Sequence, residues 1–178
     1  SPIYHGKIDP NEFDVLCEYL ELPECSFTKL ELFGDIINTG IYALAESLKI
    51  NNTLHYLYLS NNNIEVDGAI ALAESLKFNN TLMKLDISLN DIGAVGAIAF
   101  AESLENNKSL ISLNLHHNNI GDAGAIALAE SLKINNTLRY LDLGHNNIEN
   151  AEAIALAESL KINNTLRDLY LSNNNIGV

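Results

Sequence analysis

Basic residues are scarce in this chain. Lys and Arg number 10 against 23 Asp and Glu, so the net charge is −13 over 178 residues. Phosphate binding needs a basic surface, and this balance argues against a nucleic-acid role and against anionic membrane surfaces. No run of about 18 apolar residues is present either, so the sequence predicts no membrane span. A protein partner that is neutral or basic at its contact surface fits this composition better.

Cysteine and catalytic motifs are also sparse. Cys17 falls on an apolar helical stripe with Phe13, Leu16 and Leu20, and we interpret it as a reduced core residue. A disulfide between Cys17 and Cys25 remains an alternative. The sequence has no G-x-S-x-G, phosphate-loop or zinc-protease motif. We therefore predict a protein that is not an enzyme and that holds no cofactor or metal.

What the sequence does contain is a repeat of 28 residues, with copies that start at Thr53, Thr81, Ser109, Thr137 and Thr165. Each copy has the frame L-x-x-L-x-L-x-x-N-x-I, followed by a segment close to G-A-I-A-L-A-E-S-L-K-x-N-N. A fixed period of this length sets the fold, because each unit can bury its apolar face only against its neighbours. Alternation in L-x-L predicts a strand, and the A-I-A-L-A-E-S-L segment predicts a helix.

This pattern resembles the leucine-rich repeat family over residues 25–178, and its second half resembles the ribonuclease-inhibitor subtype. The resemblance implies a right-handed α/β solenoid with a parallel sheet on the concave face and helices on the convex face. We predict an N-terminal cap helix in residues 1–24, then one degenerate, four regular and one truncated repeat in 25–178. The near-identical copies also favour a leucine-rich effector of an intracellular bacterium.

Details of the frame give further expectations. Residues 1–8 are predicted as a loose lead-in to a cap helix that has no strand of its own, with Asp9 as N-cap and Pro10 in the first turn. Asp35 stands where the other copies have the frame Asn. A carboxylate only accepts hydrogen bonds, so the hydrogen bonding of this repeat should differ from that of the others. Glycines at 40, 68, 96 and 124 should precede the helices, and Glu152 replaces glycine in the fifth copy. The sequence stops after a sixth repeat strand, which predicts that the chain continues or that something covers this end.

The Asn-Asn-Thr segments at Asn51, Asn79, Asn135 and Asn163 are formal glycosylation acceptors. We interpret them instead as the turns that close each repeat, which favours a cytosolic site of action. For a bacterial effector, that would be the host cytosol.

Function is expected on the outward strand positions, because the core frame repeats while these positions differ between copies. Three outward rows are predicted, and they read Lys29, Tyr56, Lys84, Ser112, Tyr140, Asp168; then Glu31, Tyr58, Asp86, Asn114, Asp142, Tyr170; then Phe33, Ser60, Ser88, His116, Gly144, Ser172. Tyrosine is enriched at binding hot spots, although cross-strand aromatic packing is an alternative explanation. The predicted partner-binding residues are Tyr56, Tyr58, Lys84, Asp86, Asn114, His116, Arg139, Tyr140, Asp142, Arg167, Asp168 and Tyr170.

Two groups within this set have competing interpretations. Arg139 and Arg167 are placed to clamp an acidic group of the partner, or alternatively to form an ion-pair ladder within the sheet. His117 and His145 occupy the same repeat position and should be neighbours, as contacts for the partner rather than metal ligands.

We predict a non-catalytic binding module, monomeric when unbound, whose concave face engages a folded protein and regulates or inhibits it by covering its active site. The alternatives are a GTPase-activating protein similar to the Ran activators and a structural repeat fragment of a longer NLR-like receptor.

Overall fold

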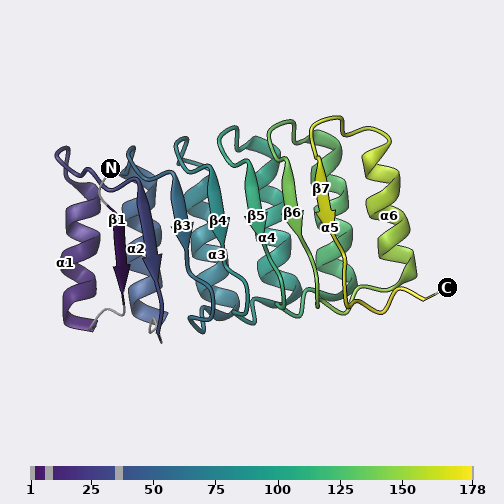
Figure 1. Cartoon of the computed structure of the whole chain (residues 1–178), viewed down its shortest axis with the longest axis horizontal. Helices are drawn as coiled ribbons and strands as arrows, with labels where there is room; N and C mark the ends of the chain where they lie inside the picture. Colours follow the sequence, from purple (N-terminus) through teal and green to yellow (C-terminus); the bar gives the residue numbers. More distant parts are fainter. Residues whose placement is uncertain (1–2, 7–9, 35–37, 178) are drawn as a thin grey trace.

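The computed structural model describes residues 3–6, 10–34 and 38–177, and these form a parallel sheet backed by a single layer of helices (Figure 1). The sheet has seven strands in sequential order. The strands are β1 (Ile3–Gly6), β2 (Lys29–Leu32), β3 (Tyr56–Tyr58), β4 (Lys84–Asp86), β5 (Ser112–Asn114), β6 (Tyr140–Asp142) and β7 (Asp168–Tyr170). The helices are α1 (Pro10–Glu21), α2 (Asn38–Ile50), α3 (Glu65–Leu76), α4 (Gly93–Asn106), α5 (Gly121–Ile134) and α6 (Asn150–Leu160).

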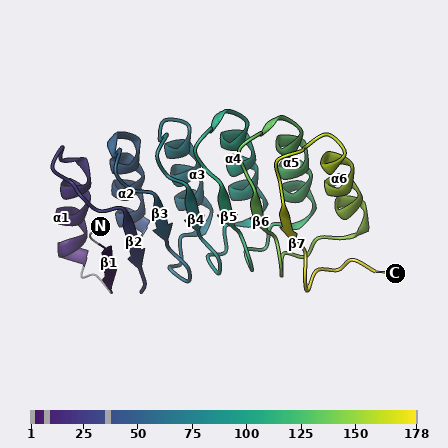
Figure 2. The ribbon, with the colours of Figure 1, turned by 45° about the horizontal axis from the view of Figure 1, so that its top comes forward.

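This arrangement confirms the predicted α/β solenoid. Figure 2 shows the helices on one side of the sheet and the other side left uncovered. Helices are wider than the strand spacing of about 4.8 Å, so a stack of such units curves with its strands inside the bend. The uncovered sheet face is therefore the concave face.

The repeated leucines create the core. Leu57, Leu85, Leu113 and Leu141 pair in register across β3 to β6, and each is at most 1% exposed. The alanines and leucines of the helices pack onto them from behind. Since successive strand residues point to opposite faces, burial of these leucines turns the residues beside them outward.

The frame glycines differ from the prediction. They lie within the first turns of the helices rather than before them. A Cβ atom on Gly68 would come within 2.9 Å of Ile41 Cγ2 in the preceding helix, and one on Gly124 within 2.8 Å of Ala97 Cβ. These positions are glycine because successive helices approach closely there.

The fifth copy breaks this rule with a buried carboxylate. Glu152 lies in the first turn of α6 and is only 6% exposed. Its Oε2 atom has no hydrogen-bond partner. Burying a charged group in this way is unfavourable, and the last helix carries that cost.

The amino-terminal segment also corrects the prediction. The cap helix was expected to lack a strand, but Ile3–Gly6 forms β1 and pairs in parallel with β2, with Ile3 opposite Lys29. The segment was misread because it lacks the leucine frame. The predicted helix is present as α1, with Phe13, Leu16, Cys17 and Leu20 buried. The expectations for Asp9 and Asp35 concern residues outside the described ranges.

Buried asparagines tie neighbouring repeats together at both edges of the sheet. At the edge where strands end, Asn118 Nδ2 donates to Ile87 O at 2.9 Å, and Asn118 Oδ1 accepts from Asn90 N at 3.0 Å. At the edge where strands begin, Asn79 Nδ2 donates to Leu48 O at 2.8 Å, and its Oδ1 accepts from Leu82 N at 2.8 Å. These side chains satisfy backbone groups that the turns would otherwise bury unpaired.

The buried asparagines at the edge where strands begin confirm that the Asn-Asn-Thr segments are structural turns. Asn51, Asn79 and Asn135 are 3–5% exposed, and their amide nitrogens are engaged in hydrogen bonds.

On the convex face, four lysines pair with the glutamate three residues before them. These pairs are Lys49–Glu46, Lys77–Glu74, Lys133–Glu130 and Lys161–Glu158. Both cysteines are free and buried, as predicted for Cys17 and contrary to the disulfide alternative.

Candidate protein-binding face

The strand register brings the predicted outward rows together. Lys29, Tyr56, Lys84, Ser112, Tyr140 and Asp168 are successive partners in one row, and Glu31, Tyr58, Asp86, Asn114, Asp142 and Tyr170 are successive partners in the next. In the third row, which lies beyond the paired strand residues, Ser60 Oγ and Ser88 Oγ lie 2.9 Å apart. Within this face two groups can be distinguished, one in which lysines surround a tyrosine and one in which carboxylates lie beside tyrosines.

The first group is basic and aromatic and lies on β2 to β4. Lys29 Nζ is 4.8 Å and Lys84 Nζ is 5.2 Å from the centroid of the Tyr58 ring. Lys29 Nζ also contacts Glu31 Oε2 at 3.1 Å. Tyr56 is 40% exposed beside them. Cation–π attraction from two ammonium groups favours this position of the Tyr58 ring, and sequence reasoning gave no sign of the arrangement.

The second group is acidic and aromatic and lies on β6 and β7. The rings of Tyr140 and Tyr170 are 5.2 Å apart, and Tyr170 is 46% exposed. Partial burial, followed by the neighbouring charge of Asp142, raises the pKa of the Tyr140 hydroxyl above its ordinary value. That hydroxyl stays protonated at neutral pH and points to Asp142 Oδ2 at 3.5 Å. Asp168 is exposed and adds a second carboxylate to this group.

Between the two groups, polar side chains bond to one another. Asp86 Oδ1 accepts from Ser88 Oγ at 2.7 Å, and Asp86 Oδ2 accepts from Asn114 Nδ2 at 3.0 Å. Asn114 Oδ1 accepts from the backbone N of His116 at 3.0 Å. Asp86 and Asn114, which were predicted to contact a partner, thus make hydrogen bonds within the face.

Three histidines form a cluster beside the acidic group, at the edge where strands end. The rings of His117 and His145 stack at 5.6 Å with an interplanar angle of 10°, which confirms that they are neighbours. His116 lies 4.9 Å from His145, and His116 Nδ1 is 3.6 Å from Asp142 Oδ1. In the described part of the chain, no group of three or more His, Cys, Asp or Glu side chains is arranged to hold a metal.

The two arginines lie at the opposite edge of the sheet, where the strands begin. Arg139 directly precedes β6 and Arg167 directly precedes β7. Together with Lys108 they line a hollow of about 270 Å³, which we call the cationic notch. Among the described residues neither guanidinium forms an ion pair with Asp142 or Asp168, so the proposed ion-pair ladder is wrong.

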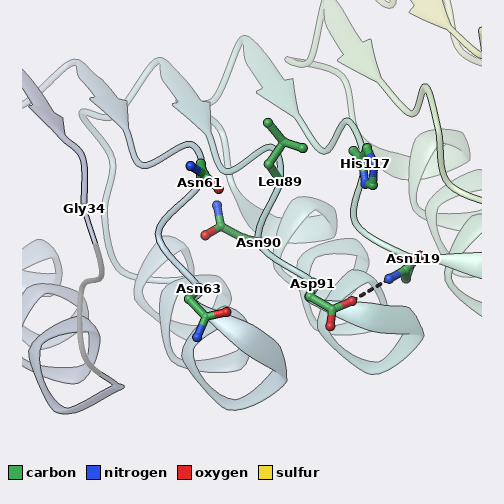
Figure 3. Close-up of a pocket in the computed structure, with 8 residues that line it drawn as sticks. All are labelled: Gly34, Asn61, Asn63, Leu89, Asn90, Asp91, His117 and Asn119. Carbon is green, nitrogen blue, oxygen red and sulfur yellow. Dashed lines mark hydrogen bonds between the residues drawn. The ribbon is translucent and has the colours of Figure 1, made fainter.

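A larger hollow of about 560 Å³ lies at the edge where strands end, and the sequence did not predict it (Figure 3). It is lined by Gly34, Asn61, Asn63, Leu89, Asn90, Asp91, His117 and Asn119. Leu89 has a positive φ of 59° and is 45% exposed. The equivalent positions in the other repeats also have a positive φ, but they are occupied by asparagine or histidine: Asn61, His117, His145 and Asn173. A leucine there is strained and solvent-facing, and its departure from the pattern was the available signal.

Across the described ranges, no helix combines the length and the apolarity that crossing a bilayer requires.

Comparison with known proteins agrees with this geometry. A family model described as Leucine Rich repeat matches residues 51–73, 78–101, 106–129, 135–157 and 163–178. Comparison with curated protein sequences gives no match. Among solved structures, the chain is similar to leiomodin-1 actin-binding site 2, with a TM-score of 0.69 and 24% identity over 86% of this chain and 90% of that one. It is also similar to the tropomodulin C-terminal domain of Caenorhabditis elegans, with a TM-score of 0.66 and 14% identity over 84% and 92%.

Proposed function

This chain belongs to the leucine-rich repeat family, and from that membership we propose that it is a non-catalytic module whose concave face binds a folded protein and regulates it by covering its active site. The observation that carries the proposal is the uncovered sheet face, on which aromatic rings of restricted mobility alternate with charges. A parallel sheet normally has both faces covered, so a face left open is available for a partner.

The two groups on this face support an extended contact. Tyr56 and Tyr170 are half-exposed and lie on β3 and β7, so they are four strand spacings apart, or roughly 19 Å. A protein surface spans that distance, whereas a small molecule reaches only one of the two groups. The Tyr58 ring contacts Lys29 and Lys84, and the Tyr170 ring contacts Tyr140. Rings that are already in contact with neighbours lose less freedom on binding, which favours affinity.

Charge indicates how the partner is oriented. On β2 to β4 the charges of Lys29 and Lys84 are offset by Glu31 and Asp86, which favours a polar contact. The carboxylates of Asp142 and Asp168 favour a basic one. The predicted neutral or basic contact surface therefore suits the β6–β7 end of the face in particular. We propose that the chain is monomeric before it binds and that it acts in the cytosol.

The finer assignments within the family are hypotheses. The ribonuclease-inhibitor subtype and the role as an effector that acts in the host cytosol rest on the repeat pattern alone. The name of one structural neighbour includes an actin-binding site, and at 24% identity this gives the fold and a first candidate to test.

Photo-cross-linking tests which face is used. A benzoylphenylalanine is placed at Tyr56 or Tyr170 on the concave face, or at Ile126 on the convex face, which is exposed to a similar degree at 45%. Cross-linking is carried out with purified actin and with extract of the cells that make the protein, and the products are identified by mass spectrometry. We expect the same partner to be captured from both tyrosine positions and not from Ile126.

The captured partner is then purified for measurement. The double change Tyr56→Ala and Tyr170→Ala should weaken binding by about tenfold or more, because truncated aromatic hot spots cost at least 1–2 kcal/mol each. Ile126→Ala should leave the affinity unchanged. Capture from Ile126 alone would contradict the proposed face. Unchanged catalytic activity of the partner in the complex would contradict regulation by active-site coverage.

A further inference from the structure

The cationic notch of Lys108, Arg139 and Arg167 differs from the surroundings of most other described lysines; Lys84 also lacks a carboxylate partner, but its Nζ lies over the Tyr58 ring. The four convex lysines each contact a glutamate at 2.5–2.6 Å, and Lys29 contacts Glu31 at 3.1 Å. In contrast, no carboxylate of the described residues pairs with Lys108, Arg139 or Arg167. In a protein with 23 acidic residues and 10 basic ones, three unpaired cations around one hollow are unexpected.

The fold explains how these cations come together. Each lies in or just after a turn closed by an asparagine side chain, and the three come from three successive repeats. Lys108 follows Asn107, while Arg139 and Arg167 stand at equivalent positions four residues after Asn135 and Asn163. Within the described part of the chain, Lys108 Nζ makes one polar contact, a long one to Asn136 Oδ1 at 3.5 Å.

Most backbone donors of the notch are already bonded, whereas among the described residues the N–H groups of Lys108, Asn136 and Asn164 have no acceptor. Thr137 N and Leu138 N donate to Asn135 Oδ1, at 3.0 and 2.8 Å. Arg139 N donates to Ile111 O and Arg167 N to Arg139 O, both at 2.8 Å. Thr137 Oγ1 lies 3.3 Å from Asn107 O. The charged donors left for a ligand are therefore two guanidinium groups and one ammonium group.

This donor set favours carboxylates over phosphate. Protein phosphate sites commonly recruit backbone N–H groups, and most of those in the notch are occupied. A guanidinium presents two parallel N–H donors that match the two oxygens of a carboxylate. A hollow of about 270 Å³ also has room for more than one such side chain.

We propose that the cationic notch binds an acidic segment of the partner protein, through Asp or Glu carboxylates held by Arg139 and Arg167 with Lys108 beside them. This inference rests on the proposed function, because it assigns a second contact to the protein that occupies the concave face. Asp168 directly follows Arg167 on β7, and Asp142 ends β6; both carboxylates lie on the sheet face rather than in the notch, and they repel an acidic segment from the face itself. The partner is thereby held in one orientation, with its basic surface over β6–β7 and its acidic segment across the upper edge of the sheet in Figure 1.

The notch is tested without the partner, using an acetylated and amidated hexaglutamate peptide as the probe. Titration into the ¹⁵N-labelled protein should shift the backbone amides of the 108–111, 136–139 and 164–167 segments. Because the cations are exposed, raising the salt to about 0.5 M should largely remove these shifts. Inorganic phosphate at the same concentration should cause much smaller changes.

A pair of double variants of equal charge supplies the control. Arg139→Gln with Arg167→Gln should weaken peptide binding by about tenfold. Lys133→Gln with Lys161→Gln removes two positive charges from the convex side of the same repeats and should change binding by less than about twofold. Circular dichroism and melting temperature check that both proteins are folded.

Equal binding by the two double variants, or the absence of shifts in the notch segments with hexaglutamate, would overturn the inference. Phosphate binding without hexaglutamate binding would overturn it as well, because the notch would then be a phosphate site. These outcomes are independent of the photo-cross-linking result. The notch can fail while Tyr56 and Tyr170 still capture a partner, and the face can fail while the notch still binds the peptide.

Discussion

Asn114 and Asn118 belong to the same repeat and are only four residues apart, yet they belong to different regions of the molecule. Asn118 is fully buried in the ladder that joins successive repeats, where its amide bonds to the repeat before it. Asn114 lies on the concave face, where its amide reaches Asp86 on the neighbouring strand. The first residue type recurs in every regular copy and the second does not. Buried frame and outward face are therefore subject to separate constraints within one repeat.

The largest expected effect tests that separation directly. Asn118→Ala leaves Asn90 N and Ile92 N buried without the Asn118 Oδ1 acceptor, which lies at 3.0 and 3.4 Å in the native protein. Ile87 O keeps one donor, Asn90 Nδ2 at 3.0 Å. We expect the free energy of unfolding to fall by about 3 kcal/mol, since each unsatisfied buried group costs about 1–3 kcal/mol. Asn114→Ala should cost less than about 1 kcal/mol. Urea unfolding followed by circular dichroism measures both, and equal losses would show that the face is as structural as the frame.

A second prediction concerns Glu152, which stands where the other copies have a glycine. Glu152→Gln removes a buried charge whose Oε2 is unpaired, while keeping the side-chain shape. The helix dipole favours an acid in the first turn by about 0.3–1 kcal/mol, but desolvation of the charge opposes it more strongly. We expect a net gain in unfolding free energy of about 1 kcal/mol.

The exposed Glu158, which pairs with Lys161 on the same helix, provides the matched control. Glu158→Gln should change the unfolding free energy by less than about 0.5 kcal/mol. A destabilised Glu152→Gln protein would mean that the carboxylate makes a favourable contact at this position.

The smallest predicted effect concerns Cys17, which is buried in the helix α1. Burial raises the pKa of the Cys17 thiol from 9.0 to about 11. The unfolded chain therefore releases this proton at lower pH than the folded one. The contribution of Cys17 to stability is complete below pH 9 and is lost as pH rises through 11, by about 1 kcal/mol at pH 10.

The difference in unfolding free energy between the wild type and Cys17→Ala isolates this term, because other titrating groups are common to both. The difference should shrink between pH 8 and pH 10. A constant difference would show that burial does not disfavour the thiolate at this position.

Several features of the fold and face were predicted from the sequence for a clear physical reason. A 28-residue period fixes which residues stack, so the outward rows and the His117–His145 contact followed from counting positions. Period-two alternation then set which residues face out, and the strand register confirms both rows. The strand β1 was missed because its pairing is made through the backbone and leaves no leucine frame in the sequence.

The sequence by itself determined the solenoid, the buried leucine and asparagine frame, and the set of side chains on the open face, because these depend on spacing along the chain. Only the tertiary structure decided which of those side chains act together. It placed Tyr58 between two lysines, left Arg139 and Arg167 unpaired at one edge with Lys108, and positioned Leu89 on the rim of the larger hollow. Such groupings depend on rotamers and on distances between repeats, and these are fixed only when the repeats pack.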